Sequence, residues 1–243
     1  MKKLFCIPYA GGSANIYSSW RKWLDNDIEL IPIELAGRGS RCGESFYTCW
    51  ESATSDLYTQ ITAQIQPGDI YGIYGHSMGS WLAYEVLKKI CVTDLEQPHE
   101  MFFSGNTPPF LEPKEDKISH LPDREFIQKI VDMGDTPLEI FDDAVIDYFL
   151  PPLRNDYILV EHYRHDYQDV NYFGNIHAYF GKDDVLAPGE IEKWCSYHHR
   201  NFEIQGFESG HMFIKDCKRE VVEKINRAFE KEKDEERSSS NIK

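Results

Sequence analysis

The sequence predicts an α/β protein in which a mostly parallel central sheet carries helices on both faces. Apolar runs of strand length alternate along the chain with longer segments whose apolar residues recur at helical spacing. This order is typical of parallel sheets whose strands are connected by helices. Residues 107–170 break the alternation, because they show helical spacings without clear strands between them. We therefore expect an inserted helical lid there.

The predicted elements follow in chain order. The strands are short segments rich in apolar residues and bounded by Gly, Pro or polar residues, at 3–8, 28–34, 69–74, 100–104, 175–181 and 202–207. The helices place their apolar residues on one face, at 16–24, 50–65, 78–90, 191–197 and 221–229. We expect one domain over residues 1–230, and a disordered tail over residues 231–243, which are charged and then Ser-rich.

The chain is strongly acidic. It has 26 Lys and Arg against 41 Asp and Glu, which gives a formal net charge of −15. Such a chain repels nucleic acid and anionic membrane surfaces, so we expect neither as a partner. We interpret Arg38, Arg41, Lys88 and Lys89 as ordinary solvated charges rather than as a basic patch for an anionic partner.

Cysteine and histidine usage gives expectations for location and metal content. The six cysteines form no Cys-x-x-Cys pair, which favours reduced thiols and a cytoplasmic location. The N-terminus leads directly into a predicted strand and has no signal-peptide pattern. No apolar run approaches the ~20 residues that a membrane span requires. The nine histidines show no metal-ligand spacing, so we expect no metal site.

The sequence Gly-His-Ser-Met-Gly at residues 75–79 points to nucleophilic catalysis. It lies between a predicted strand and a predicted helix, the context that the nucleophile elbow of the α/β-hydrolase fold requires. The elbow lifts the serine hydroxyl away from the sheet and close to a helix N-terminus, where developing negative charge is favoured. We therefore predict the α/β-hydrolase fold with Ser77 as nucleophile, rather than a Gly-rich turn with a serine cap.

A serine nucleophile needs a base, and the base is oriented by an acid. In this fold the chain order is Ser, acid, His, with the acid and the histidine on loops after later strands. His211 follows the last predicted strand and is the predicted base. Asp183 and Asp184 follow the strand before it, and the Gly-x-x-Asp spacing from Gly181 favours Asp184 as the acid. The reversed assignment of the two aspartates stays open.

The predicted oxyanion hole uses two backbone amides. One belongs to Met78, the residue after the nucleophile, and the other to the loop after the first strand. That loop reads Tyr-Ala-Gly-Gly at residues 9–12. Ala10 is the predicted donor, and Gly11 is the alternative.

Together these motifs resemble the stand-alone type II thioesterases of non-ribosomal peptide and polyketide assembly lines. The resemblance runs from residue 4 to about residue 214 in the family's order and spacing. The matching segments are residues 8–13, 34–39, 75–79, 149–156, 181–184 and 210–213. Ser80 and Ser209 depart from the family pattern, which often has glycine at both positions.

This resemblance implies a serine thioesterase that hydrolyses acyl or aminoacyl groups from the phosphopantetheine arm of acyl and peptidyl carrier proteins. Such an enzyme clears misprimed or stalled groups and restores the assembly line. It implies no cofactor of its own, because phosphopantetheine arrives on the carrier protein, and it implies a monomer.

Other functions stay open at this point. Medium-chain thioesterases of fatty acid synthesis share the superfamily, and a carboxylesterase or lipase would use the same triad on oxygen esters. An amine or alcohol could also replace water and receive the acyl group. A non-catalytic binding protein is disfavoured, because all three residue types of the triad stand at the expected places.

Overall fold

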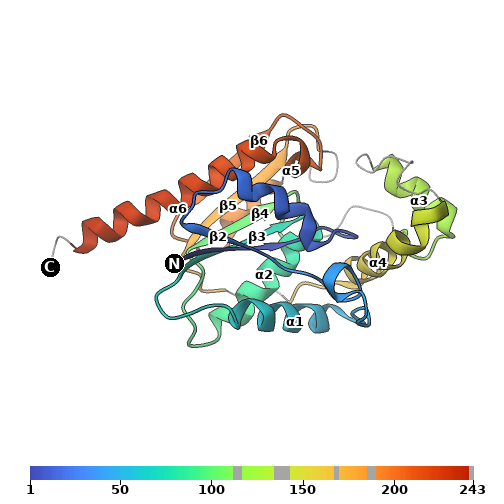
Figure 1. Ribbon diagram of the computed structural model, residues 1–243, viewed down its shortest axis with the longest axis horizontal. Coiled ribbons are helices and arrows are strands. Elements are labelled where there is room, and N and C mark those ends of the chain that lie inside the picture. The colour runs from blue at the N-terminus through green and yellow to red at the C-terminus, as the bar shows by residue number, and fades with distance from the viewer. Residues whose placement is uncertain (112–116, 134–142, 167–169, 185–189, 241–243) are drawn as a thin grey trace.

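Six strands form one sheet in the order β2-β1-β3-β4-β5-β6 (Figure 1). They are β1 (Lys2–Ile7), β2 (Ile28–Pro32), β3 (Ile70–His76), β4 (Glu100–Ser104), β5 (Asn175–Gly181) and β6 (Phe202–Phe207). This computed structural model describes the chain except for residues 112–116, 134–142, 167–169, 185–189 and 241–243. All neighbouring strands are parallel, so their carboxyl ends share one edge of the sheet. Open α/β sheets bind their ligands at this edge.

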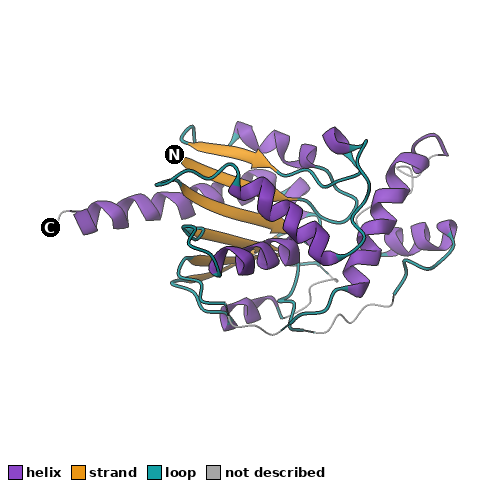
Figure 2. Ribbon diagram, turned by 90° about the horizontal axis from the view of Figure 1, so that it is seen from below, coloured by secondary structure: helices purple, strands orange, loops and turns teal. Residues whose placement is uncertain are grey.

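Helices cover both faces of the sheet, as predicted (Figures 1 and 2). The helices of the main domain are η1 (Ala14–Lys22), η2 (Gly39–Arg41), α1 (Trp50–Thr62), α2 (Met78–Cys91), η4 (Ile191–Ser196), α5 (Phe213–Asp216) and α6 (Lys218–Ser240). On one face, α1, α2 and η4 contribute Leu57, Leu87 and Trp194 to a common core with the sheet. On the other face, η1 and α6 contribute Trp20 and Phe229 to a second core.

The strand β1 shows why the sheet was visible in the sequence. Its side chains alternate between the two cores, with Phe5 and Ile7 in one and Leu4 and Cys6 in the other. A parallel strand that is covered on both faces therefore reads as a continuous apolar run.

The largest differences from the prediction lie in the helices. The helices expected at 16–24 and 191–197 are the 3-10 helices η1 and η4 rather than α-helices. The last helix, α6, continues to Ser240, through most of the segment expected to be disordered. Acidic and basic residues alone fill positions 230–237, and most of them have a high helix propensity. The absence of proline and glycine from this charged stretch lets the helix continue.

The helical insertion lies between β4 and β5 and contains α3 (Asp123–Asp132) and α4 (Asp143–His162), here called the lid. Its described residues contain no strand. Both helices lie beyond the carboxyl ends of the strands (Figure 1). They pack on each other through Phe126 and Ile130 of α3 and Leu153 and Tyr157 of α4. The lid thus has a small core of its own beside the two cores of the sheet.

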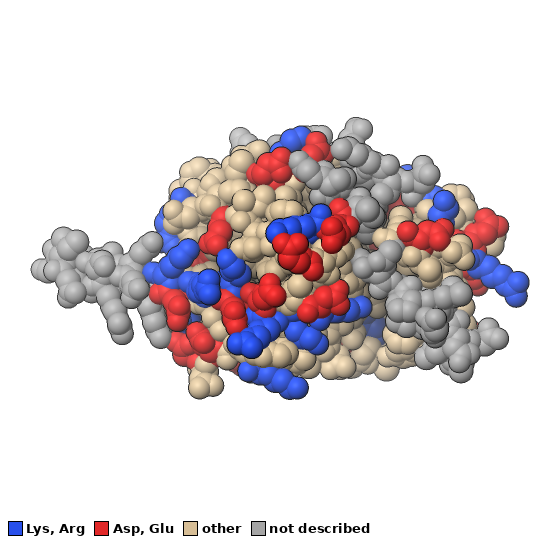
Figure 3. All heavy atoms as spheres, turned by 90° about the horizontal axis from the view of Figure 1, so that it is seen from above, with Lys and Arg blue, Asp and Glu red and all other residues tan. Residues whose placement is uncertain are grey.

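Many surface charges form ion pairs. Lys89 lies 2.6 Å from Glu51, and Arg219 lies 2.8 Å from Glu223. Basic and acidic side chains also interleave on the face that Figure 3 shows. The prediction that Arg38 is a solvated charge is wrong, because this residue is 3% exposed. In the parts of the chain that the structure describes, no helix combines the length and the apolar character needed to cross a bilayer.

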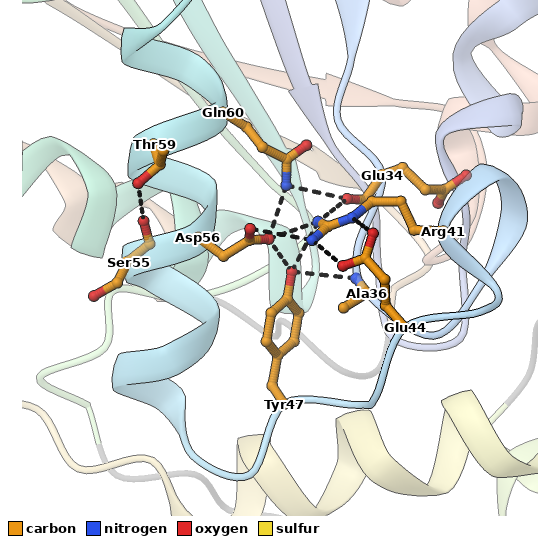
Figure 4. A network of polar contacts seen from close by, with 9 residues as sticks. All are labelled: Glu34, Ala36, Arg41, Glu44, Tyr47, Ser55, Asp56, Thr59 and Gln60. Carbon is orange, nitrogen blue, oxygen red and sulfur yellow. Dashed lines mark hydrogen bonds and ion pairs between the residues drawn. The ribbon is translucent and has the colours of Figure 1, made fainter.

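The loop between β2 and α1 is tied to α1 by a network of polar contacts (Figure 4). Arg41 Nη1 donates to Asp56 Oδ2 at 2.6 Å. The Tyr47 hydroxyl donates to the same carboxylate and accepts the Ala36 amide at 3.2 Å. Burial, together with the hydrogen bond to Asp56, raises the pKa of Tyr47 to about 12. The network fixes the loop that carries Arg38.

Candidate active site

Ser77 occupies a strained turn between β3 and α2. Its φ is 54° and its ψ −119°, and no other non-glycine residue in the described chain has a positive φ. A backbone of this kind costs of order 1–3 kcal/mol and persists only where its surroundings fix it. Here the Ser77 amide donates to the Ser104 carbonyl at 2.7 Å, and Asn106 Nδ2 donates to the Ser77 carbonyl at 3.2 Å. These bonds hold the half-buried Ser77 at the carboxyl edge of the sheet.

Gly75 is required by the close packing of the elbow. A Cβ atom at this position would lie 2.0 Å from the Gly79 carbonyl oxygen, in the first turn of α2. That oxygen belongs to backbone, so the helix would have to move. We expect Gly75→Ala to lower the free energy of unfolding by about 3 kcal/mol, the upper range for overpacked sites. Thermal unfolding checks this against Gly43→Ala, where a Cβ meets nothing within 4 Å. Equal unfolding midpoints for the two variants would contradict the expectation.

His211 and Asp184 form a pair at the same edge of the sheet. His211 Nδ1 lies 2.8 Å from Asp184 Oδ2, and the Asp184 side chain is 0% exposed. When Nδ1 carries the proton and donates it to the carboxylate, Nε2 is left as an acceptor. Asp183 is exposed, and its amide donates to the Ser209 carbonyl at 3.1 Å. The structure therefore brings Asp184 rather than Asp183 to His211.

His76, the residue before Ser77, lies against the ring of His211. Its ring centroid lies 5.1 Å from that of His211, and its Nδ1 lies 2.9 Å from Ser104 Oγ. Burial holds the pKa of His76 well below its usual range, so its imidazole is neutral. Among the described residues no hydrogen bond joins the Ser77 hydroxyl to His211. In unliganded hydrolases this bond is often long and tightens when substrate binds.

The position of His76 adds to what the sequence predicted. The contact of its ring with His211 was not predicted from the sequence. The alternation of side chains along β3 is the signal that could have revealed it. Tyr74 and His76 are two residues apart on β3 and therefore share a face. This is the face where Phe213 lies, with its ring centroid 5.3 Å from that of His76.

The predicted oxyanion loop, residues 9–12, follows β1 next to the elbow. The Gly11 amide already donates to Asp156 Oδ2 at 2.7 Å, so it is not free to bind a reacting oxygen. This leaves Ala10 as the candidate donor from the loop. Met78 is the first residue of α2, and the first amides of an α-helix have no intrahelical partner.

Asp156 and Arg38 are the residues of this region that the sequence did not predict as part of the site. Arg38 Nη1 and Nη2 donate to the two oxygens of Asp156 at 2.5 and 2.7 Å. Asp156 lies in the segment 149–156 that carries the family resemblance, but no function was assigned to it. Gly11 and Asp156 are 145 positions apart, and nothing in the spacing of the motifs predicts their contact.

A second polar cluster includes Glu85 of α2. Single ligand atoms of Glu85, His165 and Asp166 lie within 4.8 Å of one another, a spacing that could hold a metal ion. The Lys88 ammonium forms ion pairs with both carboxylates, at 3.2 Å from Glu85. A positive charge of the protein's own thus occupies the cluster.

Comparison with known proteins agrees with this architecture. The sequence model of the thioesterase domain family matches residues 2–229. Linear gramicidin dehydrogenase LgrE of Brevibacillus parabrevis is 30% identical over 217 residues, which cover 87% of this chain and 81% of that protein. Gramicidin S biosynthesis protein GrsT of Aneurinibacillus migulanus is 29% identical over 225 residues, which cover 91% and 86%.

The solved structures agree as well. The crystal structure of ClbQ, from the colibactin NRPS/PKS pathway, is 32% identical in sequence and superposes with a TM-score of 0.88. The match covers 95% of this chain and 97% of that one. The predicted α/β-hydrolase fold and the predicted family are both confirmed: this chain belongs to the thioesterase family.

Proposed function

We propose that this thioesterase hydrolyses acyl or aminoacyl groups from the phosphopantetheine arm of carrier proteins, as an editing enzyme of non-ribosomal peptide or polyketide synthesis. The observation that carries the proposal is the His211–Asp184 pair, with 2.8 Å between Nδ1 and Oδ2, beside the strained serine of the elbow. Relatives whose names connect them with gramicidin synthesis, and a structural neighbour from an NRPS/PKS pathway, support the choice of substrate.

The first half of the reaction transfers the acyl group to Ser77. The hydroxyl oxygen attacks the thioester carbonyl carbon while its proton moves to Nε2 of His211. The Ala10 and Met78 amides donate to the oxygen that becomes negatively charged. The carbon–sulfur bond then breaks, the proton passes from His211 to the departing sulfur, and the carrier leaves with a free thiol.

The second half regenerates the enzyme. Water loses a proton to His211 and attacks the acyl carbon, and the same two amides stabilise the second oxyanion. The bond between the acyl carbon and the Ser77 oxygen breaks, and the serine recovers its proton from His211. The products are a carboxylic acid and the holo-carrier, and Asp184 stabilises the imidazolium in both halves.

No step of this sequence needs a cofactor bound to the chain itself, because phosphopantetheine enters on the carrier protein. We place the enzyme in the cytoplasm as a monomer. All six cysteines are unpaired in the structure, which supports a reducing compartment.

The proposal is tested by mixing the protein with carrier proteins loaded with acetyl, aminoacyl or decanoyl groups, and following the carriers by intact mass. We expect the acetyl and aminoacyl carriers to return to the holo mass, and p-nitrophenyl esters of the same acids to react more slowly. A preference for the decanoyl carrier would indicate a medium-chain fatty acyl thioesterase instead. Ester hydrolysis without release from any carrier would contradict the proposal and indicate a carboxylesterase.

A further inference from the structure

The carboxylate of Asp156 joins three parts of the protein. It extends from the lid helix α4 and is 0% exposed. Its Oδ2 accepts the Gly11 amide at 2.7 Å and Arg38 Nη1 at 2.5 Å, while Oδ1 accepts Arg38 Nη2 at 2.7 Å. A single side chain of the lid is thus bonded to the oxyanion loop and to the loop after β2.

These contacts fix the backbone on both sides of Ala10. After it, Asp156 holds the Gly11 amide, and Arg38 Nη1 donates to the Gly12 carbonyl at 3.3 Å. A hydrogen bond from the Gly12 amide to the Tyr9 carbonyl, at 2.9 Å, spans Ala10 and closes the turn of residues 9–12. The direction of the Ala10 amide is therefore set by bonds that end on Asp156 and Arg38.

The lid also shapes this turn by packing. Gly11 has a φ of 75°, and a Cβ at this position would lie 2.7 Å from Leu153 Cδ1. Leu153 is one turn before Asp156 on α4, so both residues contact the loop from the same helix face. The lid helix α4 therefore packs so closely on the oxyanion loop that only glycine fits at position 11 without a shift.

Stability alone does not explain a buried Arg–Asp pair at this place. Removing two charges from water costs several kcal/mol per ion, and well-packed apolar residues often stabilise a protein as much as a buried ion pair does. What the ion pair adds is direction, because a bidentate guanidinium–carboxylate contact permits only one geometry. An oxyanion hole needs that property, since its donors must point to where the negative charge develops.

From this geometry we infer that Asp156 is a positioning residue of the reaction, which holds the Ala10 amide in the oxyanion hole from the lid. The inference rests on the proposed roles of Ala10 and Ser77. It also means that the lid completes the catalytic machinery as well as covering it. A lid movement that admits substrate must leave the Leu153–Asp156 turn of α4 in place, or the oxyanion hole is lost.

The test compares Asp156→Ala and Asp156→Asn with Glu100→Gln. Glu100 is a matched control because its carboxylate is also 0% exposed and bonded, to His177 Nε2 at 2.5 Å. It lies at the start of β4, the end of the sheet remote from Ser77. The substrate is a small acyl thioester such as acetyl-N-acetylcysteamine, which needs no carrier. This test can therefore be carried out, and its result interpreted, even if the protein does not act on carrier proteins.

The readouts are kcat, KM, the thermal midpoint and the affinity for a trifluoromethyl ketone, whose adduct with Ser77 places an oxyanion in the hole. We expect Asp156→Ala to lower kcat by about 10²-fold, the loss typical of one oxyanion donor, with little change in KM. Ketone binding should weaken by a similar factor. Asp156→Asn keeps an oxygen that can accept the Gly11 amide, so its losses should be smaller, and it preserves the test if the alanine variant does not fold.

A purely structural function of the ion pair makes a different prediction. Asp156→Asn and Glu100→Gln would then lower the thermal midpoint without a selective loss of kcat or of ketone affinity. That result, at a temperature where both variants are folded, would overturn the inference.

Discussion

Replacing Ser77 by alanine is expected to lower thioester turnover by about 10⁴-fold or more while the protein stays folded, because loss of a triad serine removes covalent catalysis entirely. The substitution deletes only Oγ. The Ser77 amide and carbonyl bonds to Ser104 and Asn106 are independent of the side chain, so the elbow should keep its shape.

Two measurements check this expectation. Stopped assays with an acyl-carrier substrate give the rate, and intact mass after treatment with phenylmethanesulfonyl fluoride shows whether one serine is sulfonylated. The wild type should gain one adduct and Ser77→Ala none. Ser18→Ala is the control, since Ser18 is an exposed serine on η1 that hydrogen-bonds to Asn15. If Ser77→Ala kept turnover within tenfold of the wild type, Ser77 would not be the nucleophile.

The second large effect is expected from Asp184→Asn. An asparagine presented to His211 can donate its own N–H to Nδ1, which places the imidazole proton on Nε2. His211 could then no longer accept the serine proton. A change of this kind in a serine-protease triad lowers kcat by about 10⁴-fold, and a thioester, whose leaving group is better, should lose on the order of 10²- to 10⁴-fold.

Asp183→Asn provides the matched control, because it makes the same change at the adjacent residue. Asp183 is exposed, and its described bond is made by its backbone amide, which the substitution keeps. Its kcat should stay within about threefold of the wild type, as expected for a surface change. A larger loss for Asp183→Asn than for Asp184→Asn would reverse the assignment of the acid and contradict the geometry around His211.

The strands and the elbow were predictable because their causes are local. β4, β5 and β6 begin and end at the residues that the sequence predicted. β4 and β5 are buried along nearly their whole length and are therefore rich in apolar residues, whereas β6 is mostly half-buried and alternates apolar with polar side chains. The turn at Ser77 was predictable because only a few sequences tolerate its backbone. Helix type was less predictable, because 3-10 and α-helices share nearly the same apolar spacing over one or two turns.

The arrangement of the site depended on residues that are distant in the chain. Asp183 and Asp184 are adjacent and chemically equivalent in the sequence. Packing of the loops after β5 and β6 buries one of them against His211 and leaves the other in solvent. In the same way, Ala10 and Gly11 were both plausible oxyanion donors until the Gly11 amide was found bonded to Asp156.

The sequence by itself predicted the parallel sheet, the position of the elbow and the residues proposed as nucleophile, base and acid. These predictions follow from apolar periodicity and from short motifs in which neighbouring residues of the chain act together. The tertiary structure alone decided that Asp184 contacts His211, that the Gly11 amide is bonded to Asp156, and that the lid reaches the oxyanion loop through Asp156 and Arg38. Such contacts depend on the relative placement of whole elements, and no local pattern in a single chain specifies that placement.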